Sequence, residues 1–175
     1  MEAIRESLHL NVTPFDKIPD KAFDRTFKGN REFSIIGVPV LKLINTIVLL
    51  EKANTDPEFF GLPTGKLIPI GLSPKILATY IDTLINNDTL ECFLQKDDVY
   101  ELIKKLYPKN TRTIFRTLIG MLYYQLYIIN SNEDSVSIIV DWYKTNWNLN
   151  EILVDINEDY VIKLPCETIT KKWSS

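Results

Sequence analysis

The sequence predicts a mainly α fold: a single compact helical domain over residues 1–175 with a small C-terminal β-hairpin, so that an α+β class stays open. Three observations support this. Apolar residues recur at helical spacing in segments bounded by prolines and capping residues. Apolar residues make up 45% and charged residues 25% of the chain, which suits a protein that buries one core. Two short apolar runs, 152–156 and 160–164, flank a polar turn.

Residues 1–35 are predicted to form an N-terminal entry segment. They carry six Lys or Arg and six Asp or Glu, and Pro14, Pro19 and Gly29 interrupt any long helical period. We expect a short helix from Asp20 to Phe27. The segment contains four phenylalanines that we expect to hold it against the rest of the chain: Phe15, Phe23, Phe27 and Phe33.

A central helix is predicted over residues 38–52. Pro39 suits the first helical position, where its missing N–H leaves nothing unpaired. The apolar residues that follow cover more than half of the helix circumference, which indicates burial on several sides. Residues 54–72 are rich in proline and glycine and predict a long loop.

Further helices are predicted after this loop. Ser73 and Pro74 open an amphipathic helix that ends near residue 86. Asp98 opens another as its cap, and Pro108 ends it. Thr111 opens a long apolar helix through residue 126 or beyond.

The last third of the chain is harder to assign. Residues 131–147 fit either a helix or a strand, and we favour a helix. Residues 150–165 are the candidate β-hairpin. An isolated hairpin is marginally stable, so it would have to pack on the helices.

The sequence lacks recognisable catalytic and metal-binding patterns. His9 is the one histidine, and Cys92 and Cys166 lie far apart. The stretch from Gly61 to Leu67 has one residue too few between its glycines for a phosphate-binding loop. Neighbouring carboxylates, as at 97–98, 133–134 and 158–159, favour helix capping or turns. We therefore expect no enzymatic activity, no cofactor and no metal.

Location follows from the same kind of argument. The first residues show no export signal. Polar residues interrupt the apolar tract 114–129. We expect a cytoplasmic protein without a membrane-spanning segment.

Charge is unevenly distributed along the chain, whose net charge is −3. Around Pro108 a small basic patch is expected, which would suit a nucleic-acid-associated regulator. We treat that function as the alternative, because the chain as a whole is acidic. The candidate phosphate-binding residues are Lys104, Lys105, Lys109, Arg112 and Arg116.

The opposite imbalance is larger, between Ser131 and Pro165. Seven acids stand there against two lysines, with aromatic residues among them. Aromatic side chains supply burial in protein interfaces, and carboxylates steer a basic partner. An equally weighted interpretation places the tryptophans in the core. The candidate partner-binding residues are Glu133, Asp134, Asp141, Trp142, Trp147, Glu151, Asp155, Glu158 and Asp159.

These patterns together suggest a non-catalytic binding or inhibitor protein. Its acidic, aromatic C-terminal surface would cover a basic partner such as a nuclease toxin, as immunity proteins and antitoxins do. The sequence identifies neither the partner nor the oligomeric state.

Overall fold

The computed structural model describes residues 1–60, 74–85, 99–108 and 113–146. Most of these residues are helical, and no strand occurs within the described ranges, which confirms a mainly α chain. The candidate hairpin 150–165 lies outside them. The α-helices are α1 (Glu2–Ser7), α2 (Asp20–Phe27), α3 (Arg31–Thr55), α4 (Pro74–Leu84), α6 (Val99–Leu106), α7 (Ile114–Tyr123) and α8 (Ser135–Asn146). The described residues also form the short 3₁₀ helices η1 (Phe15–Lys17) and η2 (Pro57–Phe60) and the π-helix η3 (Tyr124–Ile129).

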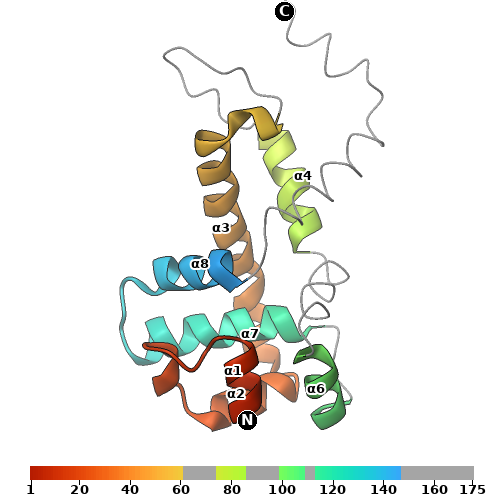
Figure 1. Ribbon diagram of the computed structural model, residues 1–175, viewed down its shortest axis with the longest axis vertical. Helices are drawn as coiled ribbons and strands as arrows, with labels where there is room; N and C mark the ends of the chain where they lie inside the picture. The colour runs from red at the N-terminus through yellow and green to blue at the C-terminus, as the bar shows by residue number, and fades with distance from the viewer. Residues whose placement is uncertain (61–73, 86–98, 109–112, 147–175) are drawn as a thin grey trace, which may run out of the picture.

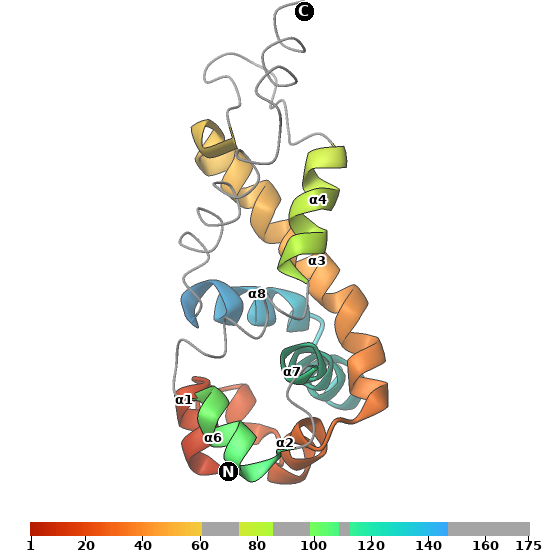
Figure 2. The ribbon, with the colours of Figure 1, turned by 90° about the vertical axis from the view of Figure 1, so that its right-hand side faces the viewer.

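The long helix α3 is the axis of the molecule (Figure 1). Near its N-terminal half it is crossed by α7, and α8 lies across it next to α7. Helices α1, α2 and α6 gather at that end, whereas α4 runs beside the other half of α3 (Figure 2). Buried side chains from each of the seven α-helices in the described ranges form one hydrophobic cluster.

The N-terminal segment is part of this core. All four phenylalanines, Phe15, Phe23, Phe27 and Phe33, are buried, as expected. Helix α2 has the predicted bounds, Asp20–Phe27. Burying each phenylalanine contributes roughly 1.5–3 kcal/mol. These four buried rings therefore hold the segment in the hydrophobic core.

Helix α3 differs from the prediction at both ends. It starts at Arg31, where the side chain of Asn30 accepts a hydrogen bond from the Phe33 amide (3.0 Å). Pro39 therefore lies inside the helix and not at its start. Pro39 cannot donate to the carbonyl of Ile35, but both residues are exposed, so water can reach that oxygen. At the other end α3 and η2 extend to residue 60, into the region predicted as loop.

The other helices agree better with the sequence. Helix α4 starts at Pro74, α6 ends before Pro108, and residues 135–146 are helical, as we favoured. The long helix after residue 113 is an α-helix up to Tyr123 and continues from Tyr124 as the wider π-helix η3. The π-type bond from the Asn130 amide to the Gln125 carbonyl (3.2 Å) closes this segment.

The α3–α7 crossing depends on two glycines that let the backbones touch. A Cβ atom on Gly37 would lie 1.8 Å from the carbonyl oxygen of Arg116. A Cβ on Gly120 would lie 1.8 Å from the carbonyl oxygen of Phe33. Since the obstacle in both cases is backbone, no side-chain rotation can relieve it. Both positions therefore require glycine at this helix separation.

A polar contact in the core joins α3 to α8. The Asn45 side chain is buried; its Nδ2 donates to the Leu41 carbonyl (2.9 Å), and its Oδ1 accepts from the Tyr143 hydroxyl (3.0 Å). Burial raises the pKa of Tyr143, so its hydroxyl stays protonated and remains a donor. The ring of Tyr143 also packs on Phe115 of α7. This contact fixes how α8 sits on the other two helices.

Helix α3 is long and apolar enough to cross a bilayer, on length and composition alone. No other described helix qualifies in this way. Of its most apolar stretch, 44% is buried inside the molecule.

We predict that Gly37→Ala and Gly120→Ala each lower the free energy of unfolding by about 3 kcal/mol, the upper end for overpacked cores. The added methyl group forces α3 and α7 apart. Denaturant unfolding followed by far-UV circular dichroism measures the loss. Ser137→Ala, at an exposed position of α8, is the control and should be close to neutral. Unchanged stability in both glycine variants would contradict the crossing.

We also predict that Tyr143→Phe costs about 1–3 kcal/mol, because it leaves the buried Asn45 Oδ1 without its donor. Thermal unfolding should show the loss. Tyr127→Phe removes a hydroxyl from an exposed tyrosine and is the matched control, expected to leave the transition unchanged. Equal transitions in the two variants would show that the Asn45 contact contributes nothing.

Candidate functional site

Only part of the predicted acidic, aromatic surface lies within the described ranges. Glu133, Asp134 and Asp141 are exposed, before and along α8. The remaining candidates, Trp147, Glu151, Asp155, Glu158 and Asp159, lie outside.

Trp142 is a core residue, and its assignment to a docking surface is wrong. Its side chain is only 5% exposed. The indole Nε1 donates to the carbonyl of Leu8 (2.9 Å), and the ring packs on Phe15 with centroids 5.9 Å apart. Because a buried indole N–H needs an acceptor, this bond fixes α8 against the N-terminal segment.

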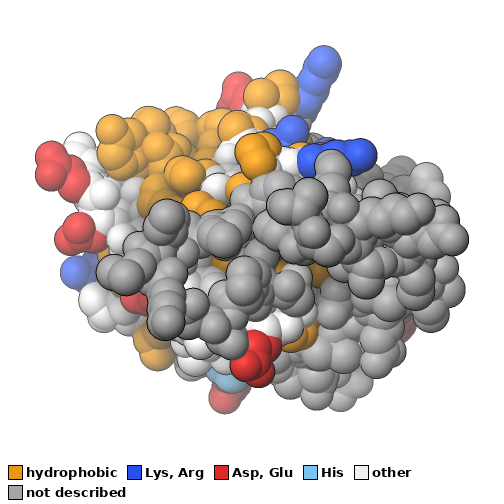
Figure 3. All heavy atoms as spheres, turned by 90° about the horizontal axis from the view of Figure 1, so that it is seen from above, with side chains coloured by type: hydrophobic (Ala, Val, Ile, Leu, Met, Phe, Trp, Pro, Cys, Tyr) orange, Lys and Arg blue, Asp and Glu red, His pale blue; other side chains and the backbone are white. Residues whose placement is uncertain are grey.

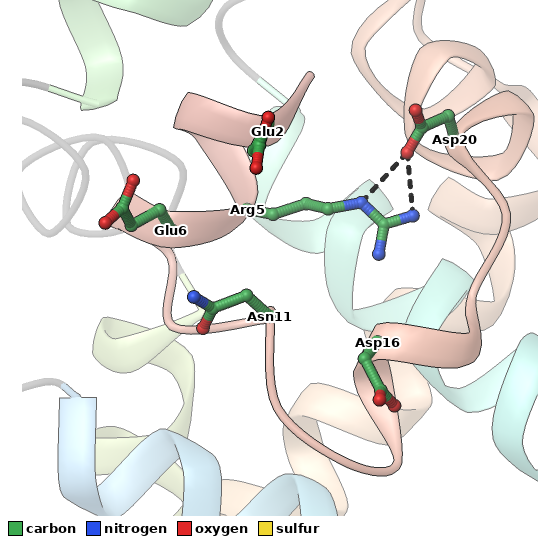
Figure 4. Close-up of a pocket in the computed structure, with 6 residues that line it drawn as sticks. All are labelled: Glu2, Arg5, Glu6, Asn11, Asp16 and Asp20. Atoms are coloured by element: carbon green, nitrogen blue, oxygen red, sulfur yellow. Dashed lines mark hydrogen bonds and ion pairs between the residues drawn. The ribbon is translucent and has the colours of Figure 1, made fainter.

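The N-terminal segment forms a polar hollow of about 500 Å³. Figure 4 shows Arg5 reaching from α1 to Asp20 at the start of α2, with Glu2 and Glu6 also on α1. The segment between these helices supplies the other lining residues, Asn11 and Asp16.

Arg5 holds the frame of the hollow together. Its guanidinium pairs with the Asp20 carboxylate (2.8 Å) and donates to the carbonyls of Phe15 (3.4 Å) and Ile18. It also lies over the ring of Phe23, 4.4 Å from the centroid. A planar group with several donors is suited to such a set of acceptors. The positive charge of Arg5 is thus balanced by contacts within the protein.

The remaining lining groups make the hollow acidic. Glu2, Glu6 and Asp16 are exposed, and none forms an ion pair within the described part of the chain. Asp16 accepts one hydrogen bond, from the Thr13 hydroxyl (3.2 Å). With Asp20 neutralised by Arg5, three carboxylates remain uncompensated. Such a group attracts cations at long range.

Sequence reasoning missed this hollow because it summed charges along the chain. Six basic and six acidic residues cancel over residues 1–35. The fold brings four of these acids to the lining of the hollow but only one of the bases, Arg5, which pairs there with Asp20. The glutamates at positions 2 and 6 of a short helix were the one local signal, since residues four apart share a helix face.

The basic patch of the alternative function is only partly described. Lys104 and Lys105 are exposed on α6, whereas Lys109 and Arg112 lie outside the described ranges. Arg116 is half-buried at the α3–α7 crossing, where its backbone and the start of its side chain face Gly37. Arg116 therefore resembles a residue packed between helices more than an exposed arginine that binds phosphate.

A small network ties the end of α6 to α2. The Tyr107 hydroxyl donates to Asp24 (3.2 Å), which also accepts from Lys28 (2.7 Å). The hydrogen bond from Lys28 lowers the pKa of the Asp24 carboxyl, and the bond from Tyr107 acts in the same direction. Burial, helped by the Asp24 charge, raises the pKa of Tyr107. These shifts are explained by structural contacts between helices.

Comparison with known proteins gives no match to a family model, a curated protein or a solved structure. Among the described residues, no three His, Cys, Asp or Glu side chains are grouped to hold a metal ion.

We predict that Arg5→Lys destabilises the protein by about 1.5–3 kcal/mol, even though it keeps the charge. A lysine cannot bond Asp20 and both carbonyls at once. Amide hydrogen exchange should speed up around Phe15–Ile18. Arg25→Lys is the control and should change little, because Arg25 is exposed and makes only a 3.5 Å contact to Glu32 and a contact 5.2 Å from the Phe33 ring centroid. Equal effects of the two variants would argue against the clamp.

Proposed function

We propose that the chain is a non-catalytic binding protein of the immunity or antitoxin type, which captures a basic partner, such as a nuclease toxin, and covers its working surface. The observation that carries this proposal is the acidic hollow lined by Glu2, Glu6 and Asp16. Its uncompensated carboxylates are complementary to a lysine- or arginine-rich surface. A charged face of this kind mainly accelerates association and selects against acidic partners.

Rigidity of the frame supports the same proposal. The hollow is built on Arg5, whose guanidinium is bonded to three groups, and on a segment pinned by Trp142. A surface that is ordered before binding loses less conformational entropy when a partner arrives. Exposed Glu133, Asp134 and Asp141 add negative charge that would act on the same partner at a distance.

We predict that Glu2→Lys with Asp16→Lys leaves the fold intact and slows partner association at least about tenfold. The immobilised full-length chain is first used to capture partners from cells of the source organism. Association of a captured basic protein with wild type and variant is then followed by stopped-flow mixing at low and high salt. Glu58→Lys on η2 reverses an exposed acid elsewhere and serves as the control.

The proposal is supported if the basic protein is lost from the double variant, retained by the control, and associates more slowly with wild type as salt rises. An association rate that the hollow variant leaves unchanged contradicts it. Capture of nucleic acid that depends on Lys104 and Lys105 would favour the regulator instead.

A further inference from the structure

Helix α3 presents an apolar stripe to solvent. Ile35, Leu43 and Leu50 are 63%, 46% and 40% exposed, and Pro39 between them is also exposed. Steps of four, four and seven residues place all four on one side of the helix over about 22 Å. Seen from the end of the molecule where α3 and α4 lie, Figure 3 shows hydrophobic side chains gathered on one side, with both Lys or Arg and Asp or Glu side chains around them.

Packing of α3 in the hydrophobic core does not account for the apolar side chains of the stripe. More than half of the most apolar stretch of α3 is unburied, because 44% of it lies inside the molecule. Thr46, within the stripe, turns its hydroxyl back to the Lys42 carbonyl (2.7 Å). That bond satisfies the one side-chain hydroxyl among these positions. The exposed face is therefore apolar along most of its length.

The charges beside the stripe are mainly positive. Arg31 and Lys42 are exposed, stand three helical turns apart on one edge, and form no ion pair in the described part of the chain. The acids of the same helix each have a basic neighbour: Glu51 pairs with Lys144 (2.6 Å), and Glu32, which lies on the side of the stripe, has a longer contact to Arg25 (3.5 Å). An acidic protein thus carries uncompensated cations next to its exposed apolar helix face.

We propose that this face of α3 docks on the surface of an anionic lipid bilayer. The apolar stripe would lie in the interface, and Arg31 and Lys42 would reach lipid phosphates with their long side chains. Helix α3 does not span the bilayer in this arrangement, because its opposite side is packed against α7 and α8 through Gly37 and Asn45. This inference is independent of the proposed partner binding.

A second copy of the chain fits this face less well. A twofold antiparallel pairing of α3 centred on Leu43 would bring the two Lys42 ammonium groups to the same edge, where they repel. Four exposed side chains are also far fewer than the roughly 20–30 residues per side of a stable interface. Charge and size both favour a lipid surface.

The test is cosedimentation of the full-length protein with vesicles of phosphatidylcholine, with and without about one-third phosphatidylserine. We expect binding to the anionic vesicles that weakens as salt rises. Lys42→Glu with Arg31→Glu should reduce the partition coefficient at least about tenfold, because each cation contributes roughly fivefold near an anionic surface. Ile35→Ser with Leu43→Ser should abolish binding.

Two variants serve as matched controls. Val12→Ser removes an equally exposed apolar side chain from the N-terminal segment. Lys17→Glu with Lys21→Glu makes the same change in net charge away from α3. Both should bind vesicles more strongly than their α3 counterparts, and circular dichroism should show all variants folded. Absence of vesicle binding, or equal loss in controls and α3 variants, overturns the proposal. A dimer detected by light scattering would also overturn the proposal if Ile35→Ser with Leu43→Ser dissociates that dimer. A second copy of the chain would then cover this face of α3.

Discussion

The backbone contact between α3 and α7 at Gly37 and Gly120 is the constraint on which the rest of the structure depends. It sets the spacing and direction of the two most central helices. Tyr143 of α8 can then reach both Asn45 of α3 and Phe115 of α7. If the two backbones moved apart, neither contact could form with its present geometry. Packed cores respond to such changes by shifting whole elements, because little empty space can absorb them.

The α3–α7 crossing also determines how the N-terminal segment is held in place. Helix α8 is fixed by Tyr143, and the neighbouring Trp142 bonds the carbonyl of Leu8. Arg5 then closes the segment on itself through Asp20 and two carbonyls. The acidic hollow is therefore a consequence of core packing. A binding surface built in this way needs little rearrangement to receive a rigid partner.

The two proposed surfaces differ in charge and in location. The hollow on α1 and η1 carries uncompensated carboxylates, and the outer face of α3 carries apolar side chains with Arg31 and Lys42 at its edge. An anionic membrane would repel the first and attract the second. A chain lying on a bilayer through α3 would thus tend to keep its acidic hollow away from the lipid, available to a basic protein.

The sequence by itself determined the mainly helical class and several helix boundaries, because caps, prolines and helical periodicity act over a few residues. Asp20–Phe27 and the end of α6 before Pro108 were predictable in this way. The tertiary structure decided the rest. Helix α3 continues through Pro39, which is exposed, and Trp142 is buried where its indole meets Leu8 and Phe15. The fold also gathers four of the six acids of residues 1–35 around one hollow, with Arg5 as the one base of its lining. Each of these outcomes depends on a partner or on solvent contact that spacing along the chain does not reveal.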